Sequence, residues 1–207
     1  MRTFLGMAPA ESPRLETERL VLFMPESRDA ERVLGYFERN RKHLERWEPS
    51  RPASFYTEPF WVRQLEVNRD EFRSDRGLRM FLAPRKHPEG QILGVANLSN
   101  IVRGVLQGCN LGYSLDGEQQ NQGLMTEALG ALVEFAFGPL QLHRVSADYQ
   151  PENDASARVL EKLGFEKQGY AERLLFLGGA WRDHVLTAKF RPGDEGPDGT
   201  SRMPLGT

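Results

Sequence analysis

The stretch NLGYSLDGEQQNQGLMTEA, residues 110–128, decides the fold of this chain. In it an apolar strand ends at Leu115, a polar loop follows over Asp116–Gln122, and a helix begins at Gly123–Leu124. The start of a helix presents backbone N–H groups without intrahelical partners and the positive end of the helix dipole. A diphosphate is a natural ligand there, and Gly123 has no side chain to keep it from the backbone. From this pattern alone, a Gly123 that merely starts a helix after a loop is an equally good interpretation.

A second informative segment, QPENDASARVLEKLGF, covers residues 150–165. Asn153 is suited to the N-cap of a helix, which makes Ser156 the third residue of its first turn. Gly164 is a suitable residue to follow the end of that helix. Taken by itself, this segment needs no explanation beyond helix capping.

The segments around these two predict a single α/β domain with a mixed order of elements. Strands are predicted over residues 19–24, 78–83, 91–101, 107–115, 144–149, 165–177 and 180–190. Helices are predicted over residues 28–40 (with Ser27 as N-cap), 41–47, 58–76, 124–137 and 154–163. The last two strands form a hairpin about Gly178–Gly179. This order indicates an α+β fold with a mixed, mostly antiparallel sheet flanked by helices, not a regular βαβ repeat.

The composition excludes several classes of protein. The formal net charge of the 207 residues is −2, without the basic excess that favours direct binding to nucleic acid or to a membrane surface. The single cysteine, Cys109, excludes an internal disulfide and a multi-cysteine metal site, and it fits a reducing cytoplasm. No metal site is predicted, and no apolar run reaches the roughly 18 residues of a membrane span. We expect the domain over residues 14–190, an N-terminal extension over 1–13 and a disordered Gly- and Pro-rich tail over 191–207.

Together, the two segments resemble the two cofactor motifs of the GNAT acetyltransferase superfamily. The first motif, Q/R-x-x-G-x-G/A at a strand–helix junction, is matched by Gln120–Met125. Two positions depart from it, since Met125 replaces the final Gly or Ala and Asn121 stands where the subgroup usually has Gly. Asn tolerates left-handed backbone geometry better than most residues. The second motif, N-x-x-S followed by a helix and L-G-F, is matched by Asn153, Ser156 and residues 163–165.

Within the superfamily, residues 14–190 are similar to the ribosomal-protein-alanine N-acetyltransferases of the RimJ/RimL type, and most similar to the RimJ group. The supporting segments are LETERL at 15–20, WEP at 47–49, GVANLSNIV at 94–102, LGYS at 111–114, GLMTEAL at 123–129, HR at 143–144 and WRDHVL at 181–186. The resemblance implies a cytoplasmic enzyme that transfers acetyl from acetyl-CoA by direct attack. The implied acceptor is the N-terminal alanine amine of small-subunit ribosomal protein five.

The resemblance also implies which residues contact the cofactor. These are Leu111, Tyr113, Gln120, Asn121, Gln122, Gly123, Leu124, Met125, Thr126, Asn153 and Ser156. A backbone N–H of the strand at 111–113 would polarise the thioester carbonyl, and Ser156 would face the sulfur and donate or relay a proton to it.

The general base has two candidates, Glu48 and Asp183. The glutamate base of RimL-type enzymes is matched here by apolar Leu175, so that role is not transferred. Glu48 borders the acceptor site in relatives. The alternative interpretation of Glu48 is a charged loop residue exposed to solvent, without a role in catalysis. Asp183 has the alternative of a structural pair with Arg182 or His184.

The acceptor is open to more than one interpretation. An α-amino group has a pKa of about 8, so it is partly neutral at pH 7 and needs a weaker base than a lysine side chain. We therefore expect residues 41–51 and the hairpin tip to form a cleft for a protein N-terminus. The alternatives are a small amine such as a polyamine, aminoglycoside or amino acid, and a non-catalytic acyl-CoA-binding module in ribosome assembly.

Overall fold

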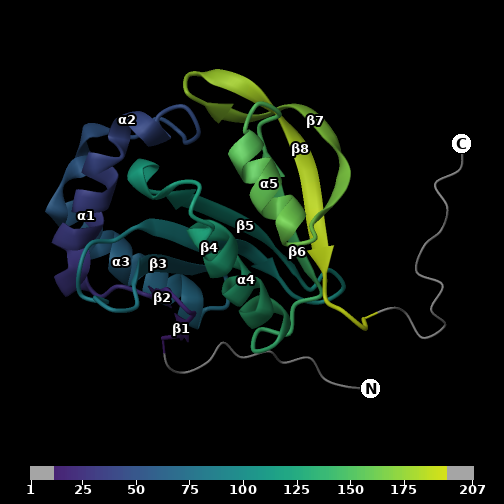
Figure 1. The fold of residues 1–207 in the computed structure, drawn as a ribbon, viewed down its shortest axis with the longest axis horizontal. Coiled ribbons are helices and arrows are strands. Elements are labelled where there is room, and N and C mark those ends of the chain that lie inside the picture. The colour runs from purple at the N-terminus through teal and green to yellow at the C-terminus, as the bar shows by residue number, and fades with distance from the viewer. Residues whose placement is uncertain (1–11, 195–207) are drawn as a thin grey trace, which may run out of the picture.

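The computed structural model describes residues 12–194, which form one mixed sheet with helices on both faces (Figure 1). The described strands follow the order β1-β2-β3-β4-β5-β6-β8-β7 across an eight-stranded sheet. Their bounds are β1 Arg14–Glu16, β2 Leu20–Phe23, β3 Leu78–Pro84, β4 Gly94–Val102, β5 Gly108–Leu115, β6 Arg144–Tyr149, β7 Glu166–Leu177 and β8 Ala180–Phe190. Strands β5 and β6 pair in parallel and the other neighbours are antiparallel, which confirms the predicted fold class.

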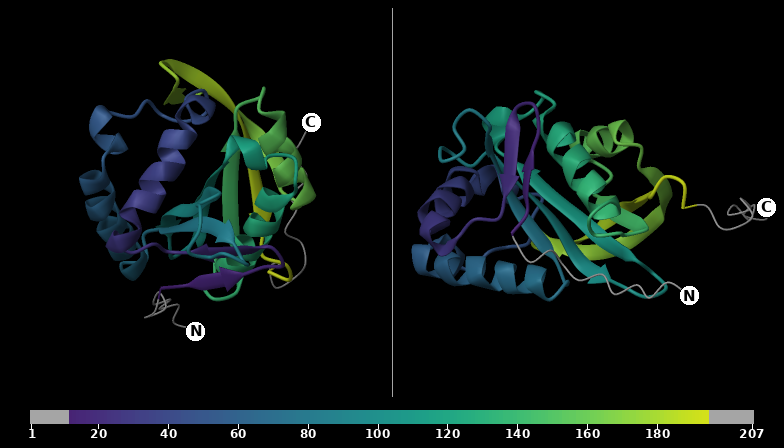
Figure 2. Two further views of the ribbon diagram at one scale, coloured as in Figure 1. Left: turned by 60° about the vertical axis from the view of Figure 1, so that its left-hand side comes forward. Right: turned by 90° about the horizontal axis from the view of Figure 1, so that it is seen from below.

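The helices lie in two layers. They are α1 Ala30–Arg39, α2 Arg41–Leu44, α3 Glu58–Arg73, α4 Leu124–Phe137 and α5 Asp154–Lys162, with 3-10 turns at Ser27–Asp29, Ala53–Tyr56 and Gly117–Gln119. Figure 2 shows α1 and α3 on one face of the sheet and α4 and α5 on the other. None of the helices within residues 12–194 has the length and apolar character needed to cross a bilayer.

The alternation of strand side chains explains the two layers. Along β3, Met80 and Leu82 belong to the core beneath α4, whereas Phe81 between them belongs to the core beneath α1 and α3. In that second core, Trp61 of α3 stacks on Phe37 of α1, with ring centroids 4.7 Å apart. A strand with apolar residues on both faces therefore separates two hydrophobic cores.

Several predicted boundaries hold, the helix predicted over residues 41–47 ends at Leu44, one strand was missed and one predicted cap is wrong. The predicted segments 124–137, 144–149 and 180–190 coincide with α4, β6 and β8. Strand β1 was not predicted, because three largely exposed residues carry no periodic signal. Ser27 is not the N-cap of α1, since it starts a 3-10 turn in which Glu26 and Asp29 cap each other. The predicted extension and tail lie outside the described residues, except for residues 12–13 and 191–194.

The sheet opens between its two parallel strands. Backbone pairing of β5 with β6 runs from Gly108–Arg144 to Asn110–Ser146 and then stops. Beyond that point β5 stays paired with β4 as far as Leu115, while β6 stays paired with β8. The second half of β5 therefore has an edge without a neighbouring strand, and backbone groups on such an edge need other partners.

Candidate active site

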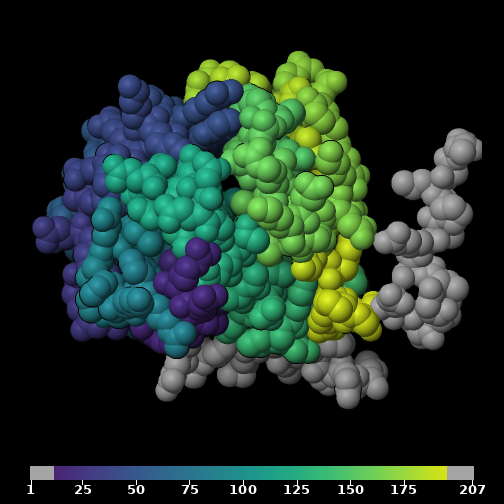
Figure 3. All heavy atoms as spheres, viewed as in Figure 1, coloured from purple at the N-terminus to yellow at the C-terminus, as the bar shows by residue number. Residues whose placement is uncertain are grey.

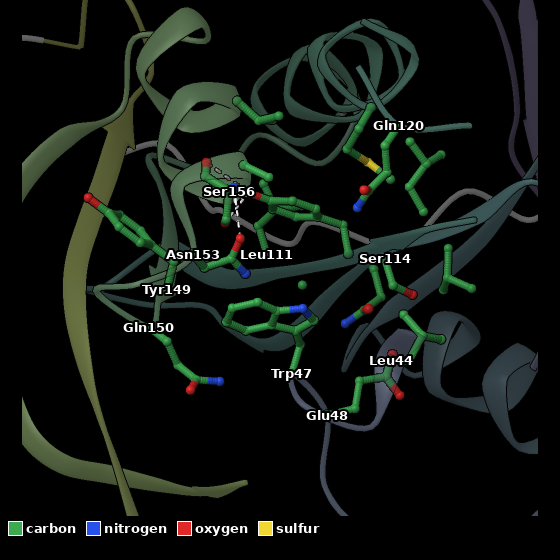
Figure 4. A pocket seen from close by; sticks show the side chains of 18 of the residues that line it. Leu44, Trp47, Glu48, Leu111, Ser114, Gln120, Tyr149, Gln150, Asn153 and Ser156 are labelled. Carbon is green, nitrogen blue, oxygen red and sulfur yellow. Dashed lines mark hydrogen bonds between the residues drawn. The ribbon is translucent and has the colours of Figure 1, made fainter. Parts of the chain in front are cut away.

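A cavity of about 580 Å³ lies at this opening. Its walls come from the ends of β5 and β6, the loop before α4, the first turns of α4 and α5, residues 43–51 and the β7–β8 hairpin. Figure 3 shows the segment around α2, the loop before α4 and helix α5 meeting on one face of the molecule. Figure 4 shows side chains from these elements pointing into the common space. Elements distant in sequence thus build one site.

The loop before α4 has the backbone geometry of an anion site. Asn121 has φ +61° and Gly123 has φ +76°, so both are left-handed, a conformation that Asn and Gly adopt more readily than other residues. Gly123 is the N-cap of α4 and provides no side chain to the cap. A Cβ at Gly123 would have one neighbour within 4 Å, Nη2 of Arg19 at 3.6 Å. The helix start is thus accessible to a diphosphate, and the Asn in place of Gly is compatible with the loop.

Hydrogen bonds from the segment between β1 and β2 hold this loop and the first turn of α4 in place. The Glu127 carboxylate, in the first turn of α4, accepts hydrogen bonds from the Thr17 hydroxyl at 2.6 Å, the Arg19 amide at 2.8 Å and Arg19 Nε at 2.6 Å. Arg19 Nη1 also donates to the Gln122 carbonyl at 2.9 Å. Burial raises the pKa of Glu127, but these hydrogen bonds outweigh it and lower the pKa. The bonds hold α4 and its preceding loop in one position.

A second network holds the loop from the side of α1. The Asp116 carboxylate, which is buried, accepts from Arg39 Nε at 2.8 Å, Asn40 Nδ2 at 3.1 Å and the Glu118 amide at 3.0 Å. The Asn40 side-chain oxygen in turn accepts from the Gly117 amide at 3.0 Å. Burial alone would raise the pKa of Asp116, yet the hydrogen bonds from Asn40 and Arg39 lower it.

Tyr113 and Ser156 form a hydroxyl pair on the cavity wall. Their oxygen atoms are 2.7 Å apart. Asn153 Oδ1 accepts from the Ser156 amide at 3.1 Å, and Figure 4 shows these two side chains next to each other. This confirms Asn153 as the N-cap of α5 and places Ser156 in its first turn. Burial raises the pKa of Tyr113 to about 12, so its hydroxyl keeps its proton at neutral pH. The pair has the chemistry to give a proton to a leaving thiolate.

The predicted cofactor positions lie together with one exception. Ten of them line the cavity: Leu111, Tyr113, Gln120, Asn121, Gly123, Leu124, Met125, Thr126, Asn153 and Ser156. Gln122 is the exception: it does not line the cavity, and its carbonyl accepts a hydrogen bond from Arg19, which holds the loop in place. Met125 is also buried in the core beneath α4, so a long apolar side chain at this motif position fills space in the protein interior.

The other end of the cavity is lined by ionisable groups from several elements. Glu48 projects from the segment after α2, and Arg51 Nη2 donates to its carboxylate at 3.1 Å (Figure 4). Arg79 of β3 also lines the wall, and burial followed by the nearby charge of Arg51 lowers its pKa. Asp148 of β6 and His184 of β8 complete this end.

Sequence reasoning missed Arg79, Asp148 and His184 as site residues. Arg79 is a charged residue within an otherwise apolar strand, a signal that the sequence does contain, whereas Asp148 is one of three polar side chains that alternate with apolar ones along β6. His184 gives no signal beyond its place in the WRDHVL segment, and strand pairing brings it to the same wall as Asp148.

Asp183 does not line this cavity. Its carboxylate accepts from the Tyr170 hydroxyl at 2.7 Å and the Arg173 amide at 2.8 Å, across the β7–β8 hairpin. Asp183 was a candidate base, with a structural pair to Arg182 or His184 as the alternative; the observed hydrogen bonds are structural, but their partners are Tyr170 and Arg173. Cys109 lies in the core beneath α4, and burial raises the pKa of its thiol to about 12, which does not suit a nucleophile.

Comparisons with known proteins agree with this geometry. Residues 19–166 match the family model of the acetyltransferase (GNAT) domain. The chain is 42% identical to the [ribosomal protein uS5]-alanine N-acetyltransferase of Escherichia coli, over 86% of this chain and 91% of that protein. A crystal structure of the ribosomal-protein-S5-alanine acetyltransferase from Vibrio fischeri superposes with a TM-score of 0.83 at 35% identity, covering 87% of this chain and 98% of that chain.

A further relative carries a ligand. The structure of Mycobacterium smegmatis RimJ in complex with CoA-disulfide has a TM-score of 0.79 at 29% identity, covering 90% of this chain and 88% of that chain. The family match spans more than half of the chain, and it includes the loop and the two helix starts that build the cavity. The chain therefore belongs to the GNAT acetyltransferase family, as an N-acetyltransferase that uses acetyl-CoA.

Proposed function

We propose that this enzyme acetylates the N-terminal alanine amine of a ribosomal protein, small-subunit protein uS5, by direct attack on acetyl-CoA. The observation that carries the proposal is the 42% identity, over nearly the whole chain, to an enzyme named for that reaction. An acceptor of this kind also implies a cytoplasmic location, because ribosomal proteins are made and assembled there.

The end of the cavity that is lined by Glu48, Arg79, Asp148 and His184 is called the acceptor end. Its shape supports a chain terminus as substrate. Gly178 at the hairpin tip lies near the backbone of Glu45 and Arg46, since a Cβ on it would be 3.6 Å and 3.8 Å from their carbonyl oxygens. Trp47 and Leu175 line the cavity just inside this contact. Residues 41–51 and the hairpin thus form the two walls of a cleft, as an extended peptide that brings its amine to the thioester requires.

The donor end supports the following roles. Backbone amides of residues 120–126 bind the diphosphate of CoA at the start of α4. The open edge of β5 over residues 111–113 pairs with the pantetheine arm, and one of its N–H groups polarises the thioester carbonyl. Asn153 hydrogen-bonds the cofactor through the side-chain nitrogen that its helix cap leaves unused. Ser156, with Tyr113 behind it, protonates the departing thiolate.

A thiol-release assay tests the proposal. Acetyl-CoA is supplied with a peptide that carries the uS5 N-terminus beginning with alanine, and the control is the same peptide with a blocked α-amine. We expect thiol release with the free peptide and a mass increase of one acetyl group at its N-terminus. Turnover of spermine or an aminoglycoside with no turnover of the peptide would replace the protein acceptor by a small amine. CoA binding without turnover of any amine would indicate the non-catalytic module.

A further inference from the structure

Two carboxylates line the described walls of the cavity, Glu48 and Asp148. Glu48 is engaged by the Arg51 guanidinium at 3.1 Å. Asp148 stands on β6, beyond the last residue of that strand to pair with β5, so it lies at the opening between the two strands. The two acids therefore approach the cavity from different elements and with different partners.

The direction of the Asp148 side chain follows from the alternation along β6. Val145, Ala147 and Tyr149 are buried in the core that contains α4 and α5. Because successive side chains of a strand point to opposite faces, Asp148 points to the other face, where the acceptor end of the cavity lies. His184 of β8 lines the same end.

Strand β5 leaves room in front of this carboxylate. The parallel register pairs Asn110 with Ser146, so two residues further on Gly112 corresponds to Asp148. Gly112 lines the cavity and has no side chain, and a Cβ there would be 3.2 Å from the Asn97 side chain. The backbone amides proposed to polarise the thioester flank this glycine, so Asp148 faces the place where bond formation occurs.

The surroundings of Asp148 favour a carboxylate that accepts a proton. The Asp148 carboxylate is open to the cavity, yet partial desolvation by its surroundings raises its pKa, against the opposing effects of His184, the Thr187 amide and Arg144. Nδ1 of His184 lies 3.0 Å from the Arg182 carbonyl oxygen, and since a carbonyl can only accept, Nδ1 carries a proton. The remaining titratable side chains on the cavity wall are His43, Glu48, Arg51, Arg79, Tyr113, Tyr149, Arg158 and Lys162.

We propose that Asp148 is the catalytic base that takes the proton from the ammonium group of the acceptor. The proposal rests on the acetyl transfer proposed above. The ammonium gives one proton to the Asp148 carboxylate, which passes it to solvent, and the neutral amine then forms the C–N bond with the thioester carbon. When the C–S bond breaks, the nitrogen loses its second proton and the thiolate gains one through Ser156. The sum is amide, free thiol and one proton released.

The test compares Asp148→Asn with wild type in kcat, KM and pH profile, using the alanine-starting peptide and spermine as acceptors. Asp70→Asn is the matched control, because Asp70 is a 69% exposed carboxylate on α3 that does not line the cavity. We expect Asp148→Asn to lower kcat at pH 7 by about 100-fold, the lower range for a lost general base, with an unchanged KM for acetyl-CoA. Its activity relative to wild type should rise with pH, as the free amine loses its proton unaided. Asp148→Glu should retain more activity than Asp148→Asn.

A second measurement separates chemistry from folding. Added formate should restore part of the activity of Asp148→Ala, which a purely structural defect does not allow. Wild-type kcat in Asp148→Asn, or a loss that neither pH nor formate relieves, would overturn the assignment of the base while leaving the acceptor intact. If wild type acetylates spermine and not the peptide, the proposal of a protein acceptor is wrong. The role of Asp148 is then decided by the kcat and pH profile of Asp148→Asn with spermine. Turnover of neither acceptor counts against both proposals.

Discussion

The Glu48 carboxylate carries a negative charge at the cavity wall and is held in position by Arg51. Its side chain is 22% exposed, and Arg51, whose guanidinium also lies 4.7 Å from the ring centroid of Phe55, donates to it at 3.1 Å. The carboxylate is therefore held at the wall of the cavity by a residue that is itself anchored in an aromatic cluster. In the reaction proposed above, this fixed negative charge attracts the ammonium group of the acceptor, and Asp148 takes its proton.

We predict that Glu48→Gln lowers kcat/KM for the alanine-starting peptide about tenfold, or about 1.4 kcal/mol of transition-state stabilisation. The amide keeps the size of the side chain but removes the charge that attracts the ammonium. The KM for acetyl-CoA should stay unchanged, because Glu48 lies at the acceptor end. Steady-state kinetics with each substrate varied in turn provide the measurement. Glu38→Gln on the exposed face of α1 is the control for loss of one negative charge, and wild-type kinetics in Glu48→Gln would show that Glu48 has no part in the acceptor site.

Among single residues, helix caps and backbone conformations were predictable from the sequence, whereas contacts between side chains on different strands were not. The N-cap at Asn153 and the tolerance of Asn121 for the left-handed region follow from each residue and its neighbours in sequence. Asp148 and His184 share a wall because β6 pairs with β8, and Arg79 joins them from β3. Those contacts depend on the sheet order, which no single segment contains.

At the scale of elements, α4 and the loop before it are held by segments far away in sequence. Thr17 and Arg19 bind Glu127, and Arg19 also binds the loop carbonyl of Gln122. The LETERL segment therefore supports the loop that we propose as the diphosphate site, and it does not line the cavity. The left-handed backbone at Gly123 is what this supported loop requires to expose the start of the helix.

We predict that Gly123→Val raises the KM for acetyl-CoA at least tenfold while the protein remains folded. A β-branched side chain is strained at φ +76°, and it would stand where the diphosphate approaches the helix start. Calorimetric titration with CoA gives the affinity directly. Gly104→Val is the matched control, since Gly104 has φ +71° in the turn between β4 and β5, where a Cβ would have no heavy atom within 4 Å. Equal CoA affinity in the two variants would remove the diphosphate from this loop.

At the scale of the whole molecule, the site exists because the sheet opens between β5 and β6. Hydrophobic periodicity predicted most of the elements, and their mixed order predicted a mostly antiparallel sheet. The end of pairing after Asn110 and Ser146 was not predictable from the patterns, because both segments continue as regular strands beyond it. Tertiary packing determines where the strands separate. Helix α5 packs against β6 in the core, and Arg39 of α1 binds Asp116 at the end of β5.

Asp116 connects the α1 layer to the loop that follows β5. Its buried carboxylate accepts from Arg39 and Asn40 at the end of α1, and Asn40 binds the Gly117 amide in return. Removing the charge leaves these donors facing an amide group that also donates. Since hydrogen bonds to a charged group contribute about 1.5–3 kcal/mol, the contact is a substantial part of the stability of a domain of this size.

We predict that Asp116→Asn lowers the free energy of unfolding by about 2 kcal/mol at pH 7. The folded-state pKa of Asp116 lies below its usual value, despite burial, because of its hydrogen bonds. A carboxyl group of this kind stabilises the fold at pH values above its unfolded pKa of about 3.9, and the stabilisation is lost as the pH falls through the folded pKa. The difference between wild type and variant should therefore be constant from about pH 6 upward and shrink below about pH 4. Urea titrations across this range measure it, with Glu38→Gln on the exposed face of α1 as the control for loss of one negative charge. A difference that persists undiminished below the folded pKa would show that packing, and not the ionised carboxylate, carries the effect.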